Sequence, residues 1–169
     1  MLARMNIRNM NGEPINFDRN NSWWPTALKK DDLFNSNFKL TINVGDISEP
    51  KDVAVLILFK GIHYLIGVAR GVPANQTLTL TWSGDPPTAG EFFESLGETI
   101  DESKTISLTW ETGYLVSETE VVLTDTIPTE IYVEVSKLGI MELAILGAVG
   151  IGIIALTYGI IKSPKYITR

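Results

Sequence analysis

Few side chains in this 169-residue chain could do acid–base or metal chemistry. It contains one histidine, His63, and no cysteine. One imidazole without thiolates excludes the multi-histidine and cysteine sites that bind zinc. No G-x-S-x-G turn supports a serine hydrolase triad around the histidine. We therefore expect no catalytic residues, no cofactor and no metal, and we interpret His63 as a hairpin residue with an ordinary polar partner.

Acidic clusters are the remaining candidates for ligand chemistry. Asp101 with Glu102, and the group Asp46, Glu49 and Asp52, offer the carboxylate oxygens that calcium prefers. Neither cluster has the spacing of an EF-hand loop. The sequence also lacks a P-loop and a G-x-G-x-x-G turn. Calcium and nucleotide binding are therefore not predicted.

Charge is divided unevenly along the chain, whose formal net charge is −6. Residues 1–84 hold nine Lys/Arg and seven Asp/Glu, whereas residues 85–134 hold twelve acidic residues and one base, Lys104. The overall acidity argues against a general nucleic-acid binder, because phosphate contacts need clustered basic residues. We interpret the acidic half as a solvated face. The alternative is a pair of oppositely charged faces that orient neighbouring copies or a basic partner.

The C-terminal region carries a strong membrane signal. Residues 143–161 form a run of nineteen residues without a charge. A helix needs about 20 apolar residues to cross a bilayer. Tyr158 and Tyr166 suit the headgroup level, where aromatic side chains are enriched. The sequence predicts a single transmembrane helix over residues 138–162.

Small residues recur in this segment at helical spacing. They are Ala144, Ala148, Gly152, Ala155 and Gly159. Such a seam lets the backbones of two membrane helices approach closely. We therefore expect the helix to pack against copies of itself or against another spanning helix. The alternative is that glycine and alanine are simply common in membrane helices.

The topology of the helix depends on two conflicting signals. The N-terminal sequence shows no apolar run typical of a signal peptide, which favours late insertion and leaves residues 1–137 on the side of synthesis. The C-terminal end of the chain is basic: Lys162 precedes the short tail, residues 163–169, which contains Lys165 and Arg169. The positive-inside rule would keep this basic end in the cytoplasm. We expect the first arrangement, because so short a tail is easily carried across.

Alternation of apolar and polar residues predicts a β domain over residues 38–137. The period of two marks strands with one buried face. It is seen in residues 38–44, 77–82, 105–110 and 130–135, with a further strand near 120–124, and residues 53–59 with 64–70 read as a central hairpin. We predict an immunoglobulin-like or small jelly-roll sandwich, although no Cys…Trp…Cys signature is present.

One short helix is expected inside this domain, over Ala89 to Leu96. Pro87 and Thr88 stand near its start and Gly97 at its end. The related segments TLTLTW and TISLTW are interpreted as two strands in similar surroundings, each with its tryptophan packed in the core near a strand end.

Residues 1–37 fit the strand pattern poorly and are interpreted as an N-terminal arm. Within the arm, Trp23 and Trp24 precede Pro25. Two adjacent large aromatic side chains are typical of a contact that fills a pocket, on the same domain or on a partner. Both options remain open, so Trp23 and Trp24 are candidate partner-contact residues.

The last predicted strand leads into the membrane segment without a Gly/Ser or Pro-rich spacer, which predicts a stiff connection. Together these features predict a non-enzymatic structural protein that links a bilayer to a protein shell. In general plan it resembles minor capsid proteins of icosahedral viruses with an internal membrane, a resemblance of architecture with no motif behind it. The resemblance implies capsid neighbours or further copies as partners, and non-specific contact of the basic tail with packaged nucleic acid.

The alternative function is a cell-surface adhesion or interaction module with an extracytoplasmic immunoglobulin-like domain. The sequons at Asn20 and Asn75 would matter in that case, because glycosylation needs an extracytoplasmic location. A membrane-bound hydrolase using His63 is a third hypothesis that ranks below both.

Overall fold

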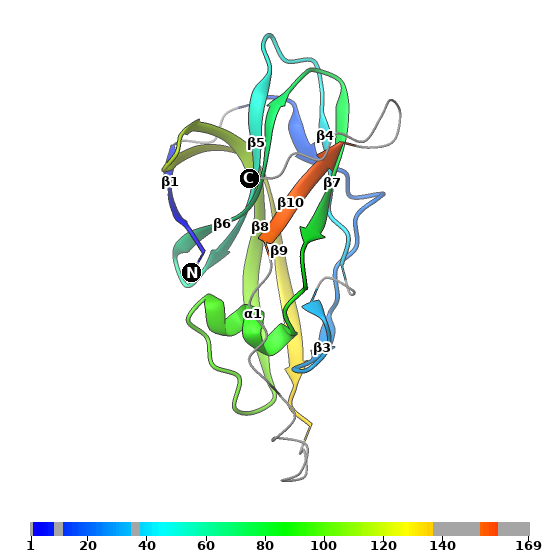
Figure 1. Ribbon diagram of the computed structural model, residues 1–169, viewed down its shortest axis with the longest axis vertical. Helices are drawn as coiled ribbons and strands as arrows, with labels where there is room; N and C mark the ends of the chain where they lie inside the picture. The colour runs from blue at the N-terminus through cyan, green and yellow to red at the C-terminus, as the bar shows by residue number, and fades with distance from the viewer. Residues whose placement is uncertain (1, 9–11, 35–37, 137–152, 159–169) are drawn as a thin grey trace.

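The computed structural model of the protein describes residues 2–8, 12–34, 38–136 and 153–158. These residues are mainly β, in two sheets with one short helix (Figure 1), which confirms the predicted class. The larger sheet contains, in spatial order, β1 (Arg4–Arg8), β6 (Ile62–Val72), β5 (Lys51–Phe59), β8 (Lys104–Ser117), β9 (Glu120–Glu134) and β3 (Ala27–Lys29). The smaller sheet contains β10 (Ile153–Tyr158), β7 (Gln76–Ser83), β4 (Thr41–Val44) and β2 (Ile15–Phe17).

Alternating side chains from both sheets build the main core. Along β8, Ile106, Leu108 and Trp110 are buried, and along β7, Leu78 and Leu80 are buried. The two rows belong to one cluster of buried side chains, because period-two alternation turns one apolar face of each sheet inward. The tryptophans that end these segments both pack against this core: Trp110 is fully buried, and Trp82 is partly buried.

The predicted central hairpin is present as β5 and β6. The turn between them places Lys60 at φ 49° and Gly61 at φ 76°, the left-handed pair that a two-residue hairpin requires. The predicted strands near 120–124 and 130–135 are, by contrast, one continuous strand, β9. The polar stretch between them stays in the sheet because it pairs with residues 109–112 of β8, and Asp125 also accepts hydrogen bonds from the Phe17 N–H and the Arg19 guanidinium.

Five strands of the larger sheet close on themselves at one end. β1 pairs antiparallel with β6 and parallel with β9, which closes a ring of β1, β6, β5, β8 and β9, called here the strand ring. Figure 1 shows β8 and β9 curling toward β1. The curl follows a register irregularity between Thr112 and Gly113, where a β-bulge increases strand bending. Inside lies a second, smaller apolar cluster of Met5, Ala54, Leu56, Val121 and Leu123.

The predicted helix is confirmed as α1 (Ala89–Ser95). Thr88 caps it: the Thr88 hydroxyl accepts a hydrogen bond from the Glu91 N–H, and the Glu91 carboxylate accepts one from the Thr88 N–H at 2.8 Å. This reciprocal capping box fixes where the helix begins. The helix buries Phe92 against Phe34, and the centroids of the two rings lie 3.8 Å apart. The helix thus covers the core at one end of the sandwich.

The first 37 residues are more structured than the sequence pattern indicated. They contribute β1, β2 and β3 to the two sheets. Each of these strands has three to five residues, too few to show a convincing period of two. Their pairing partners are distant in sequence, and this long-range pairing decides their conformation.

The predicted helix over 138–162 lies mostly outside the described residues. Six of its residues are described, Ile153–Tyr158, and they form strand β10 on β7 instead of helix. The local composition permits this, because isoleucine, threonine and tyrosine favour strands and the edge of β7 offers backbone partners. Among the described residues, no helix has both the length and the apolar character to cross a membrane.

Candidate functional site

His63 and Glu111 form a partly buried polar pair between β6 and β8 of the strand ring. His63 Nδ1 lies 2.7 Å from Glu111 Oε2. The two residues lie on β6 and β8, and β5 runs between these strands, so the side chains meet across Leu56 and Leu58. Only 3% of the Glu111 side chain is exposed, against 24% for His63. His63 thus has the polar partner that the sequence predicted, but the partner is an unusually buried carboxylate.

Burial controls the chemistry of this carboxylate. Desolvation raises the pKa of Glu111 above its usual range, and the hydrogen bond and charge of His63 oppose that rise. The neighbouring Thr112 is also buried, and its hydroxyl donates a hydrogen bond to the Ala54 carbonyl at 2.9 Å. The site therefore joins three strands of the strand ring through polar contacts inside an apolar shell.

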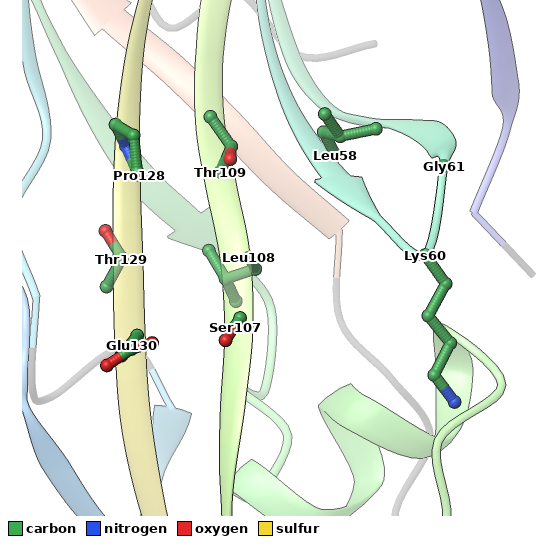
Figure 2. A pocket seen from close by; sticks show the side chains of 9 residues that line it. All are labelled: Leu58, Lys60, Gly61, Ser107, Leu108, Thr109, Pro128, Thr129 and Glu130. Carbon is green, nitrogen blue, oxygen red and sulfur yellow. The ribbon is translucent and has the colours of Figure 1, made fainter.

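A shallow trough of about 510 Å³ borders the pair on the outer face of the larger sheet (Figure 2). Leu58 lies opposite both His63 and Thr109 in the strand registers, and Thr109 is two residues from Glu111, so these side chains share a face. Side chains from the β5–β6 turn, β8 and β9 line the trough. The Lys60 side chain extends away from it toward the α1 end (Figure 2), where Lys60 pairs with Glu98.

The His63–Glu111 pair lies between two strands of the larger sheet. A carboxylate can hold an imidazole in one orientation, as in catalytic triads. Among the described residues, however, no hydrogen bond links His63 to a serine or threonine nucleophile, and no group of three metal-ligating side chains is present. The pair connects β6 and β8, which are two strands apart in the sheet.

Two of the acidic residues singled out for calcium, Asp52 and Glu49, have other partners. Asp52 accepts hydrogen bonds from Arg70 and from the Gly71 N–H. Glu49 pairs with Lys51 at 2.7 Å. The Asp52 contacts hold the start of β5 to the end of β6, so this carboxylate serves the hairpin, whereas the Glu49–Lys51 pair is local.

The two adjacent tryptophans of residues 1–37 are placed differently. Trp24 is partly buried against the main core. Trp23 is 56% exposed, and the Lys39 ammonium lies 5.3 Å from the centroid of its ring. Trp23, Lys39 and Trp82 line a groove of about 410 Å³ beside β7, called here the Trp23 groove. Of the two candidate contact residues, Trp23 is the one that the fold presents to solvent.

The smaller sheet ends at β10, which pairs with β7. β10 pairs with β7 antiparallel, in register from Ile153 opposite Ser83 to Tyr158 opposite Leu78. β10 also lies against β6 of the larger sheet. Figure 1 shows β10 crossing the front of the sandwich beside β7. The β7 edge together with the adjoining face of β6 is called here the β6/β7 site, and β10 fills it.

The predicted membrane seam and basic tail fall largely outside the described residues. Of the five small residues, Ala155 is described, and it lies opposite Thr81 in the β10–β7 register. The remaining seam residues, Ala144, Ala148, Gly152 and Gly159, and the basic residues Lys162, Lys165 and Arg169, are outside the described part of the chain.

The uneven charge is partly resolved within the domain. Three ion pairs join the basic first half to the acidic second half: Arg8–Glu120, Arg19–Asp125 and Lys60–Glu98. Arg19 and Asp125 make two hydrogen bonds, at 2.8 and 2.9 Å. Several acidic residues therefore neutralise bases of the same chain that are far away in sequence.

Comparison with known proteins returned no matching family model, no matching curated protein and no matching solved structure.

Proposed function

We propose that this protein is a non-enzymatic structural protein that links a bilayer to a protein layer. The observation that carries the proposal is the uncharged run at residues 143–161, which follows the long strand β9 without a Gly/Ser- or Pro-rich spacer in the sequence. In this proposal a β-sandwich of immunoglobulin-like or jelly-roll type contacts the protein layer, and residues 138–162 span the bilayer as a helix. The setting we favour is the internal membrane of a virion, with the domain serving as a minor capsid component.

Membrane insertion requires β10 to leave β7, and the energies are compatible with that exchange. The run 143–161 contains ten isoleucine, leucine and valine residues. At roughly −0.3 to −0.6 kcal/mol each near the helix centre, they favour insertion by at most about 3–6 kcal/mol, and the glycine, threonine and tyrosine residues of the run offset part of this gain. Strand β10 gains backbone hydrogen bonds of roughly 1 kcal/mol each but must order its residues at roughly 1–2 kcal/mol each. A bilayer can therefore compete with the β7 edge.

A disulfide reporter tests the exchange directly, because the chain has no cysteine of its own. Thr81 and Ala155 are register partners, and paired residues in antiparallel strands fall within the Cα separation that a disulfide spans. In the double variant Thr81→Cys/Ala155→Cys, oxidation in buffer should give an intramolecular disulfide. Addition of phosphatidylcholine vesicles before oxidation should suppress it and make the chain resistant to alkaline extraction.

A charge in the middle of the apolar run supplies the matched control. Gly152→Lys should cost about 2.5–3.5 kcal/mol of insertion energy and restore disulfide formation in the presence of vesicles. If the parent variant forms the disulfide equally with and without vesicles and is extracted by alkali, the proposed anchor is wrong. Chemical cross-linking in purified virions then tests whether the domain contacts a protein layer. A domain that cross-links to no shell protein would contradict the structural role.

A further inference from the structure

We propose that the β6/β7 site is a strand-addition site that accepts an uncharged, extended segment of a neighbouring protein once β10 has left for the bilayer. This inference rests on the proposed function, because β10 fills the site in the free chain. The occupant we infer is a strand of the protein layer that the domain contacts. A second copy of this chain is the alternative that the experiment must distinguish.

The departure of β10 would open both a backbone edge and an apolar face. In the smaller sheet, the Leu80 N–H donates to the Leu40 carbonyl on the β4 side. Because backbone groups alternate along a strand, the N–H and C=O groups of Thr79 and Thr81 face the opposite side, where β10 pairs. Without β10, the smaller sheet has three strands and the larger sheet still has six. The part of β6 that β10 contacts would then be uncovered. Unpaired strand edges of this kind readily accept another chain.

The chemistry of the edge defines what it accepts. β7 contains no charged residue, and its sequence QTLTLTWS alternates threonine with apolar side chains. Leu78 and Leu80 are buried in the main core beneath the edge. A charged side chain on the core-facing side of an added strand would be desolvated at high cost. The segment IIALTY shows what fits: six residues, antiparallel, uncharged and rich in β-branched side chains.

The Trp23 groove lies beside the same strand and extends the contact surface. It shares Thr79, Leu80 and Thr81 of β7 with the β6/β7 site. The exposed Trp23 ring offers a large contact area at low entropic cost, as tryptophan does in protein interfaces. A strand added at β7 would therefore bring its protein next to an aromatic anchor on the same sheet.

Peptide binding to the full-length chain tests the site. The probe is a fluorescent peptide of sequence GIIALTYG with terminal lysines for solubility, and the control peptide carries proline in place of its alanine. The probe should bind the chain inserted in phosphatidylcholine vesicles at least about tenfold more tightly than the chain in buffer, where β10 occupies the site. The control peptide should not bind, since proline removes a donor from the ladder.

Variants of the edge separate specific binding from adsorption to lipid. Thr79→Pro should abolish peptide binding to the inserted chain, whereas Thr79→Val should preserve it. The disulfide-locked Thr81→Cys/Ala155→Cys chain should bind no peptide in buffer until it is reduced and inserted.

The outcomes separate this inference from the proposed function. Insertion without peptide binding overturns the strand-addition site and leaves the anchor intact. Failure to insert overturns both, because the site then stays filled by β10. If an uninserted second copy, added to the vesicles, cross-links through its cysteine at position 155 to the cysteine at position 81 of the inserted chain, the occupant is a second copy, which overturns the assignment to a neighbouring protein.

Discussion

Replacing His63 with alanine should destabilise the domain by uncovering a buried charge. The Glu111 carboxylate is 3% exposed and lies 2.7 Å from His63 Nδ1. Removing one partner of a fully buried pair costs about 3–5 kcal/mol. Because the His63 side chain is 24% exposed, water can replace part of the lost interaction. We therefore expect a loss of about 2–3 kcal/mol in the free energy of unfolding near neutral pH.

The penalty should depend on pH with a defined sign. Burial raises the pKa of Glu111, and His63 limits the rise, so His63→Ala should raise that pKa further. A carboxyl group whose folded pKa exceeds its unfolded value, about 4.3, favours folding below the unfolded pKa. That contribution is lost as pH rises through the folded pKa. The cost of His63→Ala should therefore be largest above the folded pKa and shrink on acidification toward about pH 4.

Urea unfolding followed by tryptophan fluorescence measures these free energies. The set comprises the parent chain, His63→Ala, Glu111→Gln and the double variant. Glu111→Gln removes the charge while keeping the volume, so His63→Ala should cost much less in its presence. A coupling free energy below about 0.5 kcal/mol, or a penalty independent of pH, would show that the pair does not stabilise the strand ring as argued.

Two further predictions concern the bend of β8 and the ion pair that holds β9. Gly113→Ala should cost about 3 kcal/mol or more, because the new Cβ would lie 2.0 Å from the Val122 carbonyl oxygen, a backbone atom that cannot easily move. Gly12→Ala, with nothing within 4 Å, is the matched control and should change stability by less than about 0.5 kcal/mol; equal effects in thermal unfolding would contradict the close approach. Burial alone would raise the pKa of Asp125, but Arg19 and the Phe17 N–H together lower it. The ionised Asp125 carboxylate therefore stabilises the folded state above its unfolded pKa, and this stabilisation is lost as pH falls through the folded pKa. Arg19→Ala should therefore lower the free energy of unfolding by about 1 kcal/mol near neutral pH and by less in acid. A decrease that is the same at neutral and acidic pH in urea titrations would refute the pairing.

Local patterns predicted the elements that carry their own signal. The period of two identified the buried rows of β7 and β8, and the signals at Thr88 and Gly97 placed helix α1. These elements were predictable because each buries one regular face or caps its own end. The burial of Trp110 followed from the same alternation.

Long-range pairing decided what the pattern missed. β1, β2 and β3 are too short to show a period, and they form because β6, β9 and β4 offer them partners far along the chain. The burial of Glu111 was equally hidden, because it depends on the curl of β8 and β9 around the strand ring and on His63 reaching across β5. No local signal near residue 111 distinguishes this carboxylate from the solvated acidic residues around it.

The sequence by itself determined the β class, the single histidine, the absence of thiols and the uncharged run near the C-terminus, since these are properties of composition and local order. The tertiary structure decided which charges meet. Arg8, Arg19 and Lys60 find acidic partners in the other half of the chain, so charges that are far apart in the sequence form ion pairs in the fold. It also showed that residues 153–158 can complete a sheet, because an open strand edge accepts a segment whose composition suits both strand and membrane helix.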